Sequence, residues 1–348
     1  MTISSAATSF PAHAYDQRLL LRAFVNYWGP KLDNPVFLER LHARVGVSQR
    51  HLVLPLHEYE TLTFGQANDH WIRAACELGR QALCTALTRA SLTPRDITAI
   101  FFVSVTGIAS PSIDARLVNL MGLSPHIKRI PIFGLGCVAG AAAIARASDY
   151  VRAFPAESAA VLSVELCSLT LQRDDLSVAN LISAGLFGDG AAAVIVSGAE
   201  RPAQGPSIVA TRSIFYPGTE RLMGWDISEK GFRIVLSPEV PSIVHKHLAS
   251  DIDDFLASHN LNRHDISSWI LHTGGPKILE ATEQALGLPE TALEPSWNCL
   301  RRMGNLSSAS VLAVLEEHLA QRRQPPGSHS LLAAMGPGFC SELVLLRW

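Results

Sequence analysis

Long apolar runs are absent from this 348-residue sequence. A membrane-spanning helix needs about eighteen or more apolar residues in succession, and no segment reaches that length. The first residues, MTISSAATSFPAHAYDQ, also lack the basic start and continuous apolar core of a signal peptide. We therefore predict a cytoplasmic protein with no membrane span.

An excess of charge is also absent. The net charge is −2 at neutral pH, and charged residues make up 17% of the chain. This balance provides no bulk electrostatic attraction for nucleic acid or an anionic membrane. Hydrophobic residues make up 48%, which is typical of a globular protein with a large core. The length allows two domains, or two halves packed as one body.

The cysteines form no recognised metal-binding or redox pattern. There is no CxxC pair and no His/Cys cluster with zinc spacing, so we predict no metal site. In a cytosolic chain the thiols should be reduced and mostly buried. The six are Cys76, Cys84, Cys137, Cys167, Cys299 and Cys340.

Apolar segments rich in β-forming residues alternate with helical patterns. Strands are predicted over 96–105, 127–133, 158–166 and 191–198, and then over 208–216, 267–274, 330–336 and 342–348. Helices are predicted over 239–258, from Pro276 and from Asn305. The strands do not alternate strictly, which indicates a sheet covered on both faces. The Gly- and Pro-rich segment 198–207 divides the chain into two similar parts, 1–203 and 204–348.

One cysteine lies between glycines at the start of an alanine-rich helix, in FGLGCVAGAAAIARASDY. Unpaired N–H groups and the helix dipole at such a position lower a cysteine pKa, and the thiolate is a nucleophile. Gly136 and Gly140 allow a tight turn and leave room beside the sulfur of Cys137. The alternative is a buried, inert cysteine.

Two other turns carry polar side chains. His272 ends an apolar strand before a Gly-Gly turn, and Asn305 lies at a predicted helix start. A structural histidine and an ordinary helix N-cap are the alternatives. If the turns converge on Cys137, the three residues form a thiol–imidazole–amide set suited to acyl transfer.

This ordered set resembles the chalcone synthase-like family, the type III polyketide synthases with the thiolase fold. The resemblance covers almost the whole chain. It rests on GCVAGAAAIARASDY, GLFGDGAAAVIV, HTGGPKIL, GNLSSASVL and MGPGFCSELVLLR. It implies an α/β, thiolase-like fold in which two similar halves form a five-layered αβαβα core. It also implies a homodimer.

The resemblance implies a polyketide-forming ketosynthase, an acyltransferase. Cys137 would take an acyl group from a coenzyme A or phosphopantetheine thioester, and His272 would hold the thiolate as an ion pair. The enolate left when a malonyl thioester loses CO2 would attack that acyl group, while His272 and Asn305 stabilise the oxyanion. The thioesters are substrates, no cofactor is required, and an acyl carrier protein is a further candidate partner.

The resemblance also assigns residues that bind substrate. Phe187 would form a gate between the coenzyme A tunnel and the cavity, and Lys277 and Arg50 would contact coenzyme A at the tunnel entrance. The cavity positions fall on Val105, Thr106, Ser110, Cys167, Thr170, Ile234 and Ser307. At several of these positions the side chain is smaller or more apolar than in the plant enzymes. This composition predicts a long-chain or polyketide acyl substrate and an α-pyrone product.

Several alternatives stay open. One is a stand-alone ketosynthase that joins two carrier-protein-bound β-keto chains into an α-pyrone. Another is a type III synthase that forms naphthalenes or resorcinols. A β-ketoacyl-acyl carrier protein synthase of fatty acid metabolism shares the three residues, but the GPGF ending favours the polyketide branch. A non-catalytic thiolase-fold interaction protein is the alternative of another class.

Overall fold

The computed structural model describes residues 1–289, 291–321 and 324–348. Nine strands form one mixed sheet in the order β11-β12-β13-β8-β1-β7-β6-β4-β5. These strands are β1 (Thr2–Ser9), β4 (Ile97–Val103), β5 (Lys128–Ile132), β6 (Ser158–Leu166), β7 (Asp189–Ser197), β8 (Ser207–Phe215), β11 (Ile266–Leu271), β12 (His329–Gly336) and β13 (Cys340–Arg347). Two antiparallel pairs lie outside this sheet: β2 (His13–Asp16) with β3 (Gln49–Leu52), and β9 (Met223–Ser228) with β10 (Gly231–Leu236).

The helices cover and separate the strands. They are α1 (Gln17–Trp28), α2 (Val36–His42), α3 (Phe64–Arg89), α4 (Ile113–Met121), α5 (Ala139–Ala153), α6 (Val178–Leu186), α7 (Val240–Ala257), α8 (Pro276–Leu286), α9 (Glu294–Met303) and α10 (Ala309–Gln321). Within the described ranges, none of them combines the length and apolar character that crossing a bilayer requires.

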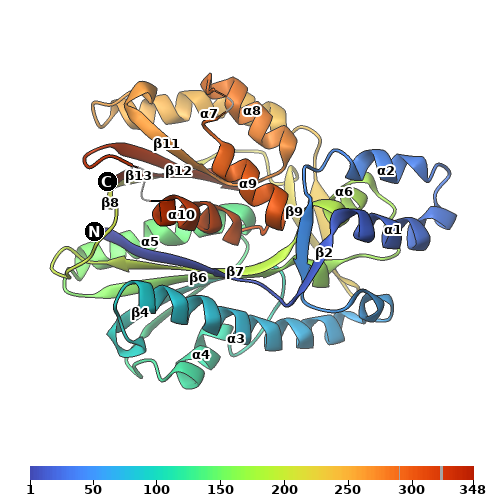
Figure 1. Cartoon of the computed structure of the whole chain (residues 1–348), viewed down its shortest axis with the longest axis horizontal. Coiled ribbons are helices and arrows are strands. Elements are labelled where there is room, and N and C mark those ends of the chain that lie inside the picture. The colour runs from blue at the N-terminus through green and yellow to red at the C-terminus, as the bar shows by residue number, and fades with distance from the viewer. Residues whose placement is uncertain (290, 322–323) are drawn as a thin grey trace.

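Five layers stack on one another in Figure 1. Helices α3 and α4 lie at the bottom, followed by the part of the sheet with β4, β6 and β7, then α5 and α10, then β11, β12 and β13, then α7 and α8. The two parts of the sheet join between β1 and β8 through one residue pair, Thr2 with Ser207. Because this connection is so narrow, the two parts separate into different layers and enclose α5 and α10.

The middle layer is built from small side chains. Ala139, Ala141, Ala143 and Ala147 on α5 are all fully buried. They belong to one apolar cluster with residues of α10 and of both parts of the sheet. Strands β6 and β7 are buried along their whole length, so their side chains are covered on both faces. Alanine lets the two layers of strands approach the central helices closely, as dense core packing requires.

The predicted strands are confirmed with small shifts in their ends. Helix α8 starts at Pro276 as predicted, but α5 starts at Ala139 and α10 starts at Ala309, each a few residues late. Strand β1, which pairs antiparallel with β7 in the middle of the sheet, was not predicted from the sequence. The predicted division at residue 203 falls in the segment between β7 and β8 and stays a prediction.

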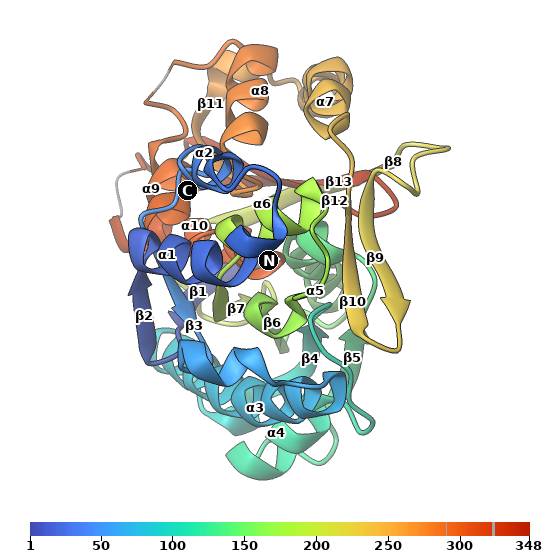
Figure 2. The ribbon, with the colours of Figure 1, turned by 90° about the vertical axis from the view of Figure 1, so that its right-hand side faces the viewer.

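One end of the molecule carries the remaining elements. Figure 2 faces this end and shows α1, α2 and α6 in front of the sheet, with the β9–β10 hairpin beside them. Trp28, Leu38 and Leu181 form a small buried cluster that holds the three helices together. This end is where the cavity described below lies.

Candidate active site

Cys137 lies on a tight turn that leads into the central helix. Residues 136–138 form a short 3-10 turn immediately before α5. Gly136 has a φ of +51°, and a Cβ atom there would lie 2.7 Å from the ring of Pro337. A Cβ atom at Gly140 would overlap the carbonyl oxygen of Ser308. The glycines beside Cys137 therefore allow two other loops to pack directly against its turn.

Asn305 lies on one of these neighbouring loops, just before α10. Its backbone N–H donates to the carbonyl oxygen of Leu186 over 2.9 Å, and its carbonyl oxygen accepts from the N–H of Gly188 over 3.0 Å. These two bonds hold Asn305 beside Phe187. Its side-chain Oδ1 accepts from the N–H of Ser307 over 2.8 Å, which leaves the amide nitrogen for another acceptor. The hydroxyl of Ser307 lies 3.8 Å from the sulfur of Cys137.

His272 follows β11 and reaches the same region through β12. Its backbone N–H donates to the carbonyl oxygen of Ala333 over 3.1 Å. Farther along β12, a Cβ atom at Gly336 would lie 2.6 Å from the backbone nitrogen of Val138. The His272 side chain is buried, and its Nδ1 has no hydrogen-bond partner among the residues described. Strand β12 therefore links the His272 turn to the Cys137 turn, and residues 307–308 link the Asn305 turn to the Cys137 turn.

Burial determines the charge state of the pair. It raises the pKa of the Cys137 thiol to about 12, from an ordinary value of 9.0. It lowers the pKa of His272 to about 4, from 6.5. Both shifts favour the neutral forms, a thiol at Cys137 and an uncharged imidazole at His272. Burial therefore opposes the predicted lowering of the cysteine pKa and the predicted ion pair, because desolvation disfavours the charged form of each group.

A buried carboxyl group lies next to the Cys137 turn. Glu165, near the end of β6, accepts from the N–H of Val105 over 3.1 Å and from the hydroxyl of Thr106 over 3.0 Å. The hydroxyl of Ser308 donates to its other oxygen. Burial raises the pKa of Glu165, although these hydrogen bonds oppose the shift. Glu165 was not predicted from the sequence, where its signal is one acidic residue in the otherwise uncharged strand SAAVLSVEL.

A cavity opens beside this group toward α1 and α6. Four of the predicted substrate-binding residues line it: Cys167, Thr170, Phe187 and Ile234. Its wall also includes Tyr59 and Ser168, whose hydroxyls are 2.7 Å apart, and Trp225. Much of the remaining lining comes from apolar residues of α1, which the sequence analysis did not assign.

The other predicted cavity residues do not line it. Val105 and Thr106 are committed to the hydrogen bonds with Glu165, and Ser307 faces Cys137. Ser110 is exposed on the loop after β4. For Val105, Thr106, Ser110 and Ser307 the assignment to substrate binding stays a prediction.

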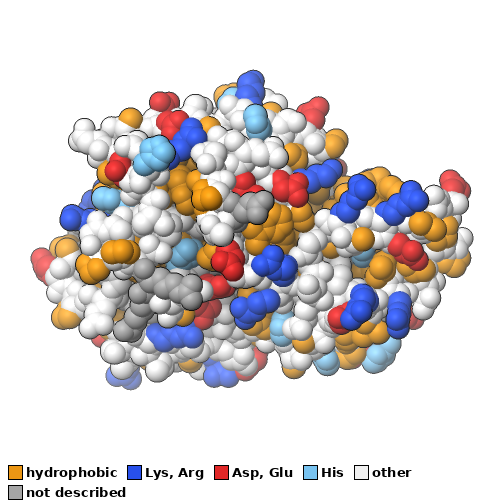
Figure 3. Space-filling model, turned by 45° about the horizontal axis from the view of Figure 1, so that its top comes forward, with side chains coloured by type: hydrophobic (Ala, Val, Ile, Leu, Met, Phe, Trp, Pro, Cys, Tyr) orange, Lys and Arg blue, Asp and Glu red, His pale blue; other side chains and the backbone are white. Residues whose placement is uncertain are grey.

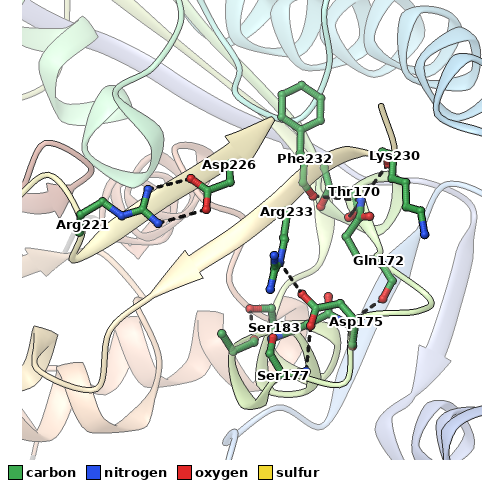
Figure 4. Close-up of polar contacts among 12 residues, drawn as sticks. Thr170, Gln172, Asp175, Ser177, Ser183, Arg221, Asp226, Lys230, Phe232 and Arg233 are labelled. Carbon is green, nitrogen blue, oxygen red and sulfur yellow. Dashed lines mark hydrogen bonds and ion pairs between the residues drawn. The ribbon is translucent and has the colours of Figure 1, made fainter. Parts of the chain in front are cut away.

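The β9–β10 hairpin forms one wall of the cavity. Ile234 on β10 pairs with Trp225 on β9, and both line the space. Figure 4 shows how the hairpin is held: Arg233 contacts the carboxylate of Asp175 over 3.1 Å. The amide of Gln172 donates to the carbonyl oxygen of Phe232 over 3.1 Å. These contacts fix the hairpin to the segment that leads into α6.

Comparison with known proteins agrees with this geometry. Models of the chalcone and stilbene synthases match the chain twice, the N-terminal domain over residues 46–200 and the C-terminal domain over residues 207–348. A 1,3,6,8-tetrahydroxynaphthalene synthase of Streptomyces peucetius subsp. caesius is 48% identical over 351 residues, which cover 100% of this chain and 93% of that protein. The chain belongs to the chalcone and stilbene synthase family.

Two further members extend the comparison. A phloroglucinol synthase of Pseudomonas fluorescens is 33% identical over 343 residues, or 97% of each chain. The crystal structure of a tetrahydroxynaphthalene synthase from Streptomyces coelicolor, a bacterial type III polyketide synthase, matches with a TM-score of 0.96 at 33% identity. That match covers 100% of this chain and 99% of the other. The predicted family, thiolase-like fold and acyltransferase class are confirmed, and the non-catalytic alternative is set aside.

The two basic residues predicted at the entrance of this synthase differ in position. Lys277 is exposed at the start of α8. Arg50 is only 2% exposed and lines the cavity, so its assignment to a surface rim is wrong. Its backbone position on β3 turns the side chain inward, where Gln17 and Phe187 accept its hydrogen bonds.

A different arginine lies near Lys277. A Cβ atom at Gly46 would lie 2.9 Å from the ring of Pro276, so the loop after α2 packs against the start of α8. Arg44 on that loop is exposed, and the sequence analysis missed it. Elsewhere the basic side chains are mixed with acidic ones over the face in Figure 3.

Proposed function

We propose that this type III polyketide synthase builds a carbocyclic aromatic product of the tetrahydroxynaphthalene class, with malonyl-CoA as starter and extender. The observation that carries the proposal is the 48% identity to a tetrahydroxynaphthalene synthase over the whole chain. The phloroglucinol synthase is also named for a phenol, a product with a carbocyclic aromatic ring. These relatives favour the naphthalene- or resorcinol-forming alternative over the α-pyrone that the sequence analysis placed first.

The chemistry of the cavity supports the same choice. Its wall includes the guanidinium of Arg50 and the hydroxyls of Tyr59, Ser168 and Thr170. The three hydroxyls already pair within the protein, but an alkyl tail would leave the free Nη2 of Arg50 without an acceptor, which is unfavourable for a buried donor. A poly-β-keto chain offers a carbonyl oxygen at every second carbon.

Transfer of the first acyl group to the enzyme begins with Cys137 as the neutral thiol and His272 as the neutral imidazole. As the sulfur of Cys137 attacks the thioester carbonyl, its proton passes to the imidazole of His272. The tetrahedral intermediate collapses with cleavage of the bond to coenzyme A. The leaving thiolate takes the proton back from His272 and departs as the free thiol. The low pKa of His272 keeps its ring available as the base at neutral pH.

During chain extension, hydrogen-bond donors of the same site stabilise a second negative charge, the one on the enolate oxygen. Malonyl-CoA loses CO2, and its enolate carbon attacks the carbonyl of the acyl group on Cys137. This attack forms the carbon–carbon bond and a tetrahedral oxyanion. Collapse of that adduct re-forms the carbonyl and breaks the bond to the Cys137 sulfur, which leaves as the thiolate, while the extended chain stays on coenzyme A until it is loaded again on Cys137. The Asn305 amide, whose oxygen is already held by Ser307, is oriented to donate to the enolate oxygen. Such a donor is typically worth about 2.7–4 kcal/mol in the transition state.

Incubation of the pure protein with [2-13C]malonyl-CoA as the only substrate tests the proposal. We expect a naphthalene tetrol, or its quinone oxidation product, with label in every two-carbon unit. Cys137→Ala is the matched control for uncatalysed chemistry. If pyrones form only when a long-chain acyl-CoA is added, and malonyl-CoA alone gives no product, the proposal fails and the predicted α-pyrone synthase is favoured instead.

Lys277 and Arg44 are proposed to bind the phosphates of coenzyme A. Removing both charges, in Lys277→Ala with Arg44→Ala, should raise the KM for malonyl-CoA about tenfold and leave kcat within about twofold, because exposed charges contribute modest, salt-dependent attraction. Steady-state kinetics at low and high salt would measure it. The exposed Lys246→Ala on α7 serves as the control. An equal rise in KM for the control would contradict the assignment.

The enzyme is also proposed to be a homodimer, since symmetric dimers are the commonest oligomers. Light scattering at micromolar concentration should give twice the mass of one chain. A fully active monomer under those conditions would contradict this prediction.

A further inference from the structure

Arg50 is a buried cation with an unused donor. Its Nε donates to Oε1 of Gln17 over 3.0 Å, and its Nη1 donates to the carbonyl oxygen of Phe187 over 2.5 Å. Its Nη2 is buried and has no hydrogen-bond partner among the residues described. A guanidinium has five N–H donors, so part of its hydrogen-bonding capacity is unmet here.

The charge also has no counter-ion in contact. Within the described chain, no carboxylate lies within ion-pair distance of Arg50. The nearby carboxyl of Asp189 instead accepts from the N–H groups of Val53 and Ser168, each over 2.8 Å. Burial lowers the pKa of Arg50 to about 10, which still leaves it charged at neutral pH. An unpaired buried charge is unfavourable for folding, and groups of this kind cluster at functional sites.

Arg50 lies between the predicted catalytic turn and the cavity. A Cβ atom at Gly304, the residue before Asn305, would lie 3.1 Å from Cδ of Arg50. Its guanidinium bonds the backbone of Phe187, which adjoins Asn305. Arg50 also lines the cavity together with Cys167 and Thr170. A chain that grows from Cys137 into this cavity passes its side chain.

We propose that Arg50 binds ketone or enolate oxygens of the growing β-keto chain through its free Nη2 donor. The cavity then selects oxygenated chains over alkyl chains of the same length. This inference rests on the proposed function in one respect: the chain extended on Cys137 is a poly-β-ketone. Arg50 is a specificity-determining residue in this role, and its bonds to Gln17 and Phe187 hold the guanidinium in place for it.

The geometry suits oxygen recognition better than a purely structural role. A structural role needs only the bonds to Gln17 and the Phe187 carbonyl, and a neutral donor would supply those without burying a charge. Guanidinium donors bind charged or strongly polar oxygens with fixed directionality. A hydrogen bond between Nη2 and a ketone becomes stronger as that ketone takes on enolate character, which the β-diketone units of such a chain do readily.

Three primers of equal length test the proposal: hexanoyl-CoA, 3-oxohexanoyl-CoA and 5-oxohexanoyl-CoA, each extended with malonyl-CoA. In the wild type we expect at least one oxo primer to exceed hexanoyl-CoA in kcat/KM by about ten- to a hundredfold, the typical effect of a hydrogen bond to a charged group. Arg50→Met should reduce that ratio to near one. Arg50→Lys should retain part of it, because the charge remains.

Gln17→Leu is the matched control, since it removes a bond to Nε but leaves Nη2 intact. It should lower all three rates together and keep the ratio. Equal losses for all primers in Arg50→Met would overturn the proposal and leave Arg50 a structural residue. If that variant does not fold, the wild-type ratio still decides: a value near one overturns the proposal. These ratios are measurable whether malonyl-CoA alone yields a naphthalene or a pyrone, so failure of the proposed function is detected separately.

Discussion

Replacing Cys137 by alanine is expected to abolish the acyl-enzyme and to lower turnover of malonyl-CoA on the order of 10⁴-fold or more. The reason is that no second nucleophile can substitute for the sulfur at the meeting point of the three turns, and loss of a nucleophile from a cooperating set typically has effects of this size. Intact-protein mass spectrometry after treatment with an acyl-CoA measures the adduct directly. The wild type should gain one acyl mass and Cys137→Ala none.

Two other cysteines provide controls for this experiment. Cys76 is half-buried on α3 and Cys299 is buried on α9, and neither belongs to the three turns that carry Cys137, His272 and Asn305. Cys76→Ala and Cys299→Ala should therefore still load one acyl group. Cys167 is the informative competitor, because it lines the cavity, and burial raises its pKa well above the ordinary value. A stable adduct on Cys167 in the wild type would contradict the assignment of Cys137.

Much of the fold follows from local sequence. The strands β4, β6 and β7 are buried, apolar and bounded by turns, so their existence and order are readable from composition. Strand β1 was missed because TISSAATS is rich in Ser and Thr, and its role in the middle of the sheet depends on β7, far away in the chain. A polar-looking segment at the chain start gives no local signal of that partner.

The candidate site was readable to a similar extent. Cys137, His272 and Asn305 each lie near glycines at the end of a strand or the start of a helix, a pattern that indicates a tight turn carrying a functional side chain. The inward position of Arg50 was not readable. Its neighbours Gln17, Phe187 and Gly304 come from three distant segments, and nothing in SQRHLV distinguishes a buried arginine from a solvated one.

The ionisation of Cys137 shows a second limit. A sequence locates a helix start and hence a favourable dipole, but it does not give the depth of burial. The structure places the thiol on a 3-10 turn two residues before α5, with Glu165 nearby and little solvent. Desolvation of a fully buried group shifts a pKa by several units, more than a helix terminus supplies. The sign of the shift therefore depended on tertiary packing.

Gly140→Ala is expected to have the second-largest effect on activity. Whether it raises or lowers the melting temperature shows whether helix propensity or tertiary packing dominates at this position. Alanine is about 1 kcal/mol more favourable than glycine inside a helix, so local propensity predicts stabilisation. In this fold the added Cβ atom would overlap the carbonyl oxygen of Ser308 and approach Val311 and Leu312 to 3.1 and 3.3 Å. Backbone atoms cannot rotate away, and overpacking of a dense core typically costs about 1–3 kcal/mol. Packing should outweigh propensity.

The same clash should separate the Cys137 turn from the Asn305 turn. A displacement of about 1 Å between reacting groups can lower a rate roughly a hundredfold, so kcat/KM for malonyl-CoA should fall by about that factor, together with a lower melting temperature. Gly65→Ala on α3 is the control, because nothing lies within 4 Å of its added Cβ atom. It should leave both quantities nearly unchanged. If Gly140→Ala instead melts higher and retains full activity, the two turns are not packed against each other as described, and the small residues of α5 serve helix stability alone.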